Sequence, residues 1–315
     1  MSQRTVTPRL SWAELPASVR DAARSALGAA VVRDLPQSGG FSPGLASRLV
    51  LADGRRVFAK AISAARNPRS PGLYRREIEV MSALPATVPA PRLRWSLDDG
   101  DWVMLVLDDI EGHMPATPWI PAELTRVMTA LEQLAGALDP APISAPSIVD
   151  DLEENFSSWH AVATEPALLA LQDPWARENI DRLVALETGW ADAARGTALL
   201  HADLRADNLL LTDNAVMVVD WPYAVVGAPW VDALLFLPSV AATSPALDLE
   251  QVWAGFAPAR GVDPDAVNAV LAAVAGDFLR QSLLPAPVNL PGLRAHQRDK
   301  GTAALAWLRH RLLSA

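Results

Sequence analysis

The stretch that decides the fold is HADLRADN at 201–208, in which Asp203 and Asn208 stand five residues apart. This is the spacing of a His-x-Asp-x4-Asn loop, where the aspartate accepts a hydroxyl proton and the asparagine binds a metal ion. Twelve residues after Asn208, the strand-like sequence VMVVD ends at Asp220. Carboxylate and amide oxygens are ligands that Mg²⁺ prefers. A single Asp or Asn often marks only a turn, but the ordered set indicates a site of phosphoryl transfer.

Upstream of this stretch, the sequence predicts a small β-rich lobe. SRLVLADGRRVFAKAI at 47–62 indicates two strands joined at Asp53-Gly54, because Asp-Gly suits a two-residue hairpin turn with positive φ at both residues. Lys60 lies on the second strand. The other expected elements are an amphipathic helix at 11–28, a glycine-rich loop at 37–44, a helix at 73–84 stopped by Pro85, and a strand at 102–112.

Downstream, helical periodicity predominates. The expected helices lie at 121–139, 175–195, 249–257, 264–284 and 302–313. One β-rich interruption at 198–221 lies among them, with a hairpin that turns at Asp213-Asn214. The sequence therefore predicts an α+β fold with two lobes: a β-rich lobe at 1–108 and a larger, mainly helical lobe at 109–315.

The chain is unusually poor in lysine. Of its 27 basic residues, only Lys60 and Lys300 are lysines. A sequence that otherwise uses arginine raises the expectation that each remaining lysine supplies an ammonium group specifically. Lys60 and Lys300 are therefore both candidates for such a role.

These motifs together resemble the aminoglycoside phosphotransferases and their small-molecule kinase relatives, which have a protein-kinase-like bilobal fold. The resemblance extends from about residue 37 to 240. The stretches that carry it, besides the 201–208 loop and Asp220, are GGFSPG at 39–44, VFAK ending at Lys60, RREIEVMSAL around Glu77, WVMLVLDDIEG at 102–112 and GAPWVDAL at 227–234.

The resemblance implies roles for the central residues. Asp203 would orient the acceptor hydroxyl and take its proton, Asn208 and Asp220 would hold Mg²⁺, and Lys60 would contact the nucleotide phosphates while Glu77 fixes it. Glu79 is the rival of Glu77, but it lies about 200° further around the helix, so both cannot face Lys60. The spacing to Met81 and Leu84 favours Glu77.

The resemblance also implies the remaining contacts with ATP or GTP, which residues 1–108 would bind. The phosphates would be covered by the glycine-rich loop, that is, by Gly39, Gly40, Phe41, Ser42 and Gly44. Adenine would pair with main-chain groups near Leu105 to Asp108, with Leu107 as the named candidate. Two readings of Arg205 remain open: a bidentate contact to the transferring phosphoryl group, or a solvated side chain. Asp232 would anchor the backbone of the catalytic loop, and His201 would brace it.

Composition limits the partners. With 36 acidic and 27 basic residues, the chain has a net charge of −9, which argues against nucleic acid as a partner. There is no cysteine, no signal-peptide pattern, and the apolar stretch at 223–242 is interrupted by proline and aspartate, so we expect a cytoplasmic protein without a membrane span. The acidic run at 150–154 is either a wall for a cationic substrate or a solvated helix face.

The acceptor is expected to be a small molecule. Only WPYAVVGAPWV separates Asp220 from Asp232, which leaves little room for a peptide platform. An aminoglycoside or another antibiotic, with a role in resistance, is the leading substrate class, and a sugar or an amino alcohol is the next. The alternative from another class is a nucleotide-binding protein without catalysis.

Overall fold

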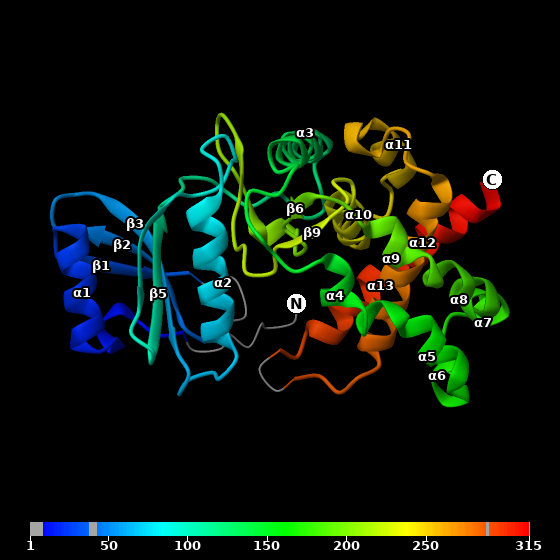
Figure 1. Ribbon diagram of the computed structural model, residues 1–315, viewed down its shortest axis with the longest axis horizontal. Helices are drawn as coiled ribbons and strands as arrows, with labels where there is room; N and C mark the ends of the chain where they lie inside the picture. Colours follow the sequence, from blue (N-terminus) through cyan, green and yellow to red (C-terminus); the bar gives the residue numbers. More distant parts are fainter. Residues whose placement is uncertain (1–8, 38–42, 288–289, 315) are drawn as a thin grey trace. The chain divides into compact units, whose positions relative to one another are not determined.

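The computed structural model describes residues 9–37, 43–287 and 290–314. The chain divides into two compact units, coloured along the sequence in Figure 1. Unit 1 comprises Met1–Pro115 and Asp207–Tyr223, and unit 2 comprises Ala116–Ala206 and Ala224–Ala315. The chain therefore returns to unit 1 within the 201–208 stretch, at Asp207.

Unit 1 is built on a five-stranded antiparallel sheet with the strand order β1-β2-β3-β5-β4. Its strands are β1 (Val31–Pro36), β2 (Leu45–Leu51), β3 (Arg56–Ser63), β4 (Leu93–Asp98) and β5 (Trp102–Asp108). Helices α1 (Ala17–Leu27) and α2 (Ser70–Ala83) cover opposite faces of the sheet (Figure 1).

Alternation along β3 decides which side chains meet which helix. Val57, Ala59 and Ala61 belong to one buried cluster with Val19 and other apolar residues of α1. Because successive side chains of a strand point to opposite faces, Lys60 points to the face that α2 covers. The alternating pattern thus places the ammonium group of Lys60 between the sheet and α2.

Two local expectations in unit 1 need correction. The segment expected as one helix at 11–28 is a 3₁₀ turn, η1 (Trp12–Glu14), followed by α1, because Pro16 precedes the first turn of α1 and has no N–H to continue a helix. The β2–β3 hairpin has a longer loop than the two residues expected: Gly54 alone has positive φ, at +87°, and its N–H bonds the carbonyl of Leu51.

Unit 1 is completed by the hairpin expected around Asp213-Asn214. Its strands are β7 (Leu209–Leu211) and β8 (Val216–Val218), which pair in antiparallel register. Asn208 ends the short 3₁₀ turn η3 (Ala206–Asn208) immediately before β7. Asp220 follows β8 by two residues.

Unit 2 is mainly helical, with one small antiparallel pair of strands, β6 (Ala198–Leu200) and β9 (Val225–Gly227). Its longest helices, α12 and α13, lie side by side (Figure 1). The helical segments are α3 (Pro121–Ala137), α4 (Ile148–Leu152), η2 (Asn155–Ser157), α5 (Ser158–Thr164), α6 (Pro166–Ala170), α7 (Pro174–Glu178), α8 (Ile180–Thr188), α9 (Trp190–Ala194), α10 (Val231–Thr243), α11 (Leu249–Gly255), η4 (Ala257–Ala259), α12 (Pro264–Ser282) and α13 (Leu293–Ser314).

The sequence pattern located some of these helices better than others. The helix expected at 175–195 is three helices, α7, α8 and α9, separated at Asn179 and Gly189. The apolar stretch at 223–242 includes α10, which is buried almost all round, so a search for amphipathic periodicity does not reveal it as a helix. In the described part of the chain, no helix has both the length and the apolar character needed to cross a membrane.

A buried carboxylate holds the start of α5. Both oxygens of Glu187, on α8, accept backbone hydrogen bonds, from the N–H of Trp159 at 2.9 Å and that of His160 at 3.0 Å. These N–H groups lie in the first turn of α5, where no intrahelical acceptor exists. Burial raises the pKa of Glu187 to about 7, although the backbone N–H groups oppose the shift.

We therefore expect a pH-dependent contribution of Glu187 to stability. Its carboxyl group binds a proton more tightly in the folded chain than in the unfolded chain, where the pKa is 4.5. The stabilisation is thus fully present below pH 4.5 and is lost as the pH rises through about 7. The measurement is urea unfolding of the wild type and Glu187→Gln between pH 4 and 8, and the wild-type advantage should shrink as the pH rises. A pH-independent difference would contradict the assignment.

Candidate functional site

Three charged side chains from distant parts of the sequence meet in unit 1. Lys60 Nζ lies 2.8 Å and 2.6 Å from the two carboxylate oxygens of Glu77 and 2.5 Å from Oδ1 of Asp220. Strand β3, helix α2 and the segment after β8 each supply one of these residues. A single ammonium group therefore joins three elements of unit 1.

Burial and charge act in opposite directions on Lys60. Burial alone would lower its pKa, but the carboxylates of Asp220 and Glu77 outweigh burial and raise the pKa of Lys60 above its ordinary value. Burial raises the pKa of Glu77, and Lys60 opposes that rise. We conclude that Lys60 is a cation throughout the physiological range and that Glu77 is its buried counter-ion.

Helix geometry explains why Glu77 and not Glu79 occupies this position. Glu77 is only 1% exposed, on the same face of α2 as Tyr74, whose ring centroid lies 5.6 Å from Lys60 Nζ. Glu79 is exposed to solvent. The expected ion pair between Lys60 and Glu77 is therefore present, while its role towards a nucleotide stays a prediction.

The backbone around Asp220 is bent sharply. Asp220 has a positive φ of +69°, a conformation that few side chains adopt. The next residue, Trp221, is fully buried and donates its indole N–H to the carbonyl of Val218 at 3.0 Å. The N–H of Val219 bonds the carbonyl of Asn208 at 3.0 Å. These contacts fix the turn and tie the backbone of Asn208 to the residue that precedes Asp220.

The donor chemistry of Asn208 and Asp220 fits Mg²⁺. One carboxylate and one amide are hard oxygen ligands, and Mg²⁺ is commonly held by one or two carboxylates together with water and substrate phosphates. Among the described residues, no group of three or more histidines and carboxylates forms a dedicated metal cage.

The predicted nucleotide contacts are only partly within the described residues. Gly39, Gly40, Phe41 and Ser42 lie outside them. Gly44 lies immediately before β2, where a Cβ atom would come within 2.3 Å of the carbonyl oxygen of Ala61, so only glycine fits. Leu107 is buried near the end of β5, with Phe58 as its register partner on β3.

In unit 2, the loop that contains Asp203 is held by a buried carboxylate. Asp232, in the first turn of α10, accepts hydrogen bonds from the backbone N–H groups of His201 at 2.7 Å and Ala202 at 2.8 Å. The fully buried His201 accepts the N–H of Asp203 through Nδ1 at 3.2 Å. Ala202 is thereby kept at a positive φ of +61°. Asp232 and His201 thus anchor the loop, as the resemblance implied.

Lys300 is the residue whose position sequence reasoning did not find. Because lysine is rare in this chain, Lys300 was a candidate for a specific role, but no motif connected it with Asp203, which lies 97 residues earlier. In unit 2 it lies within electrostatic range of both Asp203 and Arg205, and it is buried. Arg205 itself is partly buried and is therefore not simply solvated. The carboxylates at 150–154 are exposed, which favours the solvated-face reading of that run.

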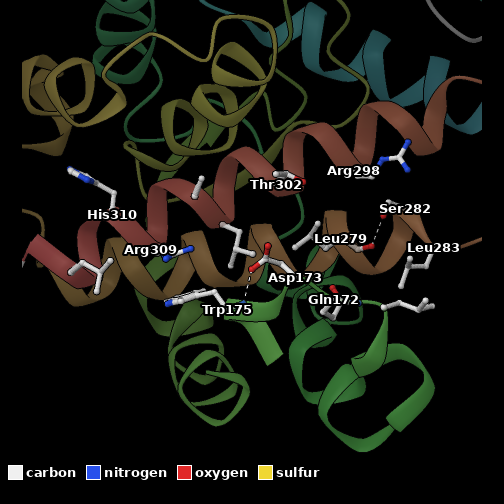
Figure 2. A pocket seen from close by; sticks show the side chains of 14 residues that line it. Gln172, Asp173, Trp175, Leu279, Ser282, Leu283, Arg298, Thr302, Arg309 and His310 are labelled. Carbon is white, nitrogen blue, oxygen red and sulfur yellow. Dashed lines mark hydrogen bonds between the residues drawn. The ribbon is translucent and has the colours of Figure 1, made fainter. Parts of the chain in front are cut away.

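A hollow of about 500 Å³ lies along α13, away from the face of the helix that carries Lys300. Figure 2 shows that α13 contributes Arg298, Thr302, Arg309 and His310 to its lining, and Trp175 of α7 lies opposite. Arg298 and Thr302 flank Lys300 at two residues on either side, about 200° around the helix. Neither Lys300 nor Asp203 lines this hollow.

The chain matches a known protein family. A family model described as "Phosphotransferase enzyme family" matches residues 38–269, more than half of the chain. The chain belongs to the phosphotransferase enzyme family. The match begins within the glycine-rich loop at 37–44 and ends within α12. No curated protein sequence matches the chain.

Solved structures of phosphotransferase proteins share this fold. An aminoglycoside phosphotransferase from Alicyclobacillus acidocaldarius superposes with a TM-score of 0.59 at 17% identity, covering 90% of this chain and 93% of that one. The ternary complex of APH(4)-Ia with ADP and hygromycin B gives 0.58 at 17%, covering 93% and 98%. A choline/ethanolamine kinase family protein from Mesorhizobium loti gives 0.55 at 17%, covering 93% and 97%. The predicted α+β, protein-kinase-like fold is confirmed.

The buried ion pair predicts a difference between two glutamates of one helix. Glu77→Ala leaves Lys60 with only one counter-ion and should lower the free energy of unfolding by about 3 kcal/mol, because a buried charge loses its partner. The exposed Glu79→Ala is the matched control and should change it by less than about 0.5 kcal/mol. Chemical denaturation measures both, and equal effects would contradict the pairing.

Proposed function

We propose that this protein transfers the γ-phosphate of ATP or GTP to a hydroxyl group of a small molecule. The observation that carries the proposal is the Lys60 ammonium group held between Glu77 and Asp220. Phosphate transfer needs a fixed cation for the nucleotide phosphates and a carboxylate for the metal, and here one interaction fixes both. In this proposal residues 1–108 bind the nucleotide, and residues 109–315 supply the catalytic aspartate and bind the acceptor.

Each side chain then has a defined role. The acceptor oxygen forms a bond to the γ-phosphorus, the bond from that phosphorus to the β–γ bridging oxygen breaks, and the nucleoside diphosphate leaves. The hydroxyl proton passes to the Asp203 carboxylate. Lys60 binds the nucleotide phosphates, and Asn208 and Asp220 hold Mg²⁺. When bound, Mg²⁺ supplies positive charge to the phosphate oxygens. Arg205 contacts the transferring phosphoryl group.

The proposed acceptor is an aminoglycoside-like antibiotic or a hydroxylated metabolite in the cytoplasm. Similar folds include proteins described as a macrolide 2'-phosphotransferase, a putative fructosamine-3-kinase and a choline/ethanolamine kinase family protein. At these low identities the likenesses support only the small-molecule class. Only eleven residues separate Asp220 from Asp232, and β9 takes up three of them, which further supports a small acceptor.

Asp203 tests the proposed chemistry. Asp203→Ala should slow phosphorylation by about 10²–10⁴-fold, the usual contribution of a general base, and should leave nucleotide affinity near normal. Asp151→Ala, which removes an exposed carboxylate of unit 2, is the control. The measurement is ADP release together with phosphorus NMR of the acceptor product. A wild type that binds nucleotide but phosphorylates no acceptor would favour the non-catalytic alternative.

Asp220 tests the metal assignment separately. Asp220→Ala should abolish the extra thermal stabilisation that Mg²⁺ adds to ATP, because the carboxylate ligand of the metal is lost. Asp213→Ala, at the exposed turn between β7 and β8, is the matched control. The measurement is a thermal-shift titration with ATP in the presence and absence of Mg²⁺. An unchanged response of Asp220→Ala to Mg²⁺ would remove Asp220 from the metal site.

A further inference from the structure

The second lysine of the chain, Lys300, is buried within electrostatic range of Asp203. Lys300 lies on α13 and is only 8% exposed, on the helix face that also carries Gln297 and Gly301. Gly301 lets α13 approach α12 closely, because a Cβ atom there would lie 2.9 Å from the backbone nitrogen of Leu279. The close approach places the Lys300 ammonium group 4.2 Å from the ring centroid of Phe278.

Lys300 forms no ion pair or hydrogen bond through its ammonium group within the part of the chain that the structure describes. The nearby carboxylate of Asp277, on α12, accepts other donors: Asn155 at 3.1 Å and Gln281 at 2.6 Å. Gln281 in turn accepts a hydrogen bond from Gln297 at 2.8 Å. Both donors bond Oδ1 of Asp277, and its carboxylate acts on Lys300 by electrostatic attraction without a direct ion pair among the described residues.

The charges around Lys300 define a small electrostatic site. Burial lowers the pKa of Lys300 to about 8; Asp203 opposes this shift, Arg205 adds to it, and Asp277 opposes it. At neutral pH the side chain therefore remains mainly a cation. Lys300 thus lies within electrostatic range of a second cation, Arg205, and of the carboxylate that the proposed reaction uses.

A buried ammonium group without an ion pair is costly unless something else binds it. Phe278 compensates only part of this cost, since a cation–π contact contributes about 0.5–2 kcal/mol. The complementary ligand is an anion. A polycationic acceptor would bring further positive charge next to Lys300 and Arg205, which is unfavourable in a site of low polarity.

We propose that Lys300 binds an anionic group of the acceptor, a carboxylate or a phosphate, beside the hydroxyl group that Asp203 activates. This inference rests on the proposed function and narrows it to hydroxylated acids and phosphate esters. Lys300 is then a specificity-determining residue on the acceptor side, and Asp277, Gln281 and Gln297 position the helix faces around it.

The test uses four sugars that share one pyranose ring: glucuronate, glucose 6-phosphate, glucose and glucosamine. ADP release at saturating Mg²⁺-ATP should show a KM at least about tenfold lower for an anionic sugar than for glucose or glucosamine, as expected for a charge-assisted hydrogen bond. The first two sugars distinguish a carboxylate from a phosphate. A preference for glucosamine, or no difference among the four, would overturn the proposal.

Variants separate this role from a structural one. Lys300→Met keeps the length and bulk of the side chain and should raise the KM for the anionic sugar about tenfold while leaving the KM for glucose unchanged. Lys300→Arg should retain part of the preference. Arg298→Met removes a cation from the opposite face of α13 and should leave the preference intact. If Lys300→Met affects charged and neutral sugars alike, the contact is structural and the proposal is wrong.

Failure of the proposed function is recognised independently. Isothermal titration of the four sugars into wild-type protein without nucleotide measures binding alone. A preference for the anionic sugars that Lys300→Met removes, together with no ADP release, would uphold the Lys300 site and reject phosphotransfer to these acceptors. Turnover confined to glucose or glucosamine would uphold phosphotransfer and reject the Lys300 site. If neither anionic sugar binds, the Lys300 site is also overturned.

Discussion

The ion pair of Lys60 with Glu77 and Asp220 is the interaction on which unit 1 depends. A nearly buried ammonium group requires carboxylate partners, and the fold supplies them from a helix and from a segment more than 140 residues further along the chain. The alternation of β3 puts Lys60 under α2, the helical period puts Glu77 on the inner face, and the β7–β8 hairpin brings Asp220 back. Each of these elements therefore positions one charge of the proposed nucleotide site.

Unit 2 also depends on buried carboxylates, but there they bind backbone N–H groups. Its buried carboxylates Asp232 and Glu187 each satisfy two backbone N–H groups, one pair in the 201–208 loop and the other in the first turn of α5. Burial raises the pKa of both carboxyl groups, and the backbone hydrogen bonds oppose the rise. These carboxylates act on the backbone, so they shape the unit without needing to take part in the chemistry. Asp203 keeps its fixed place because the loop around it is held in this way.

The distribution of charge bears on the acceptor more than net charge does. The chain carries a net charge of −9, yet the acidic run at 150–154 is exposed, whereas the group buried near Asp203 is the ammonium of Lys300. An overall acidic composition therefore gives no reason to expect a cationic substrate. The charge near Asp203 is decided instead by the few side chains that α12 and α13 bury within electrostatic range of it.

The sequence by itself determined the loop at 201–208, the strand bearing Lys60, the choice of Glu77 over Glu79, and the two-lobed α+β fold, because local spacing and periodicity encode each of them. It did not determine that α10 is a helix, because a segment buried on all sides has no amphipathic period, nor that 175–195 breaks into three helices. The two lysines show the division most clearly. Lys60 stood within a recognisable strand motif, whereas only the packing of α13 on α12 brought Lys300 near Asp203, through contacts between residues far apart in the chain that no local pattern records.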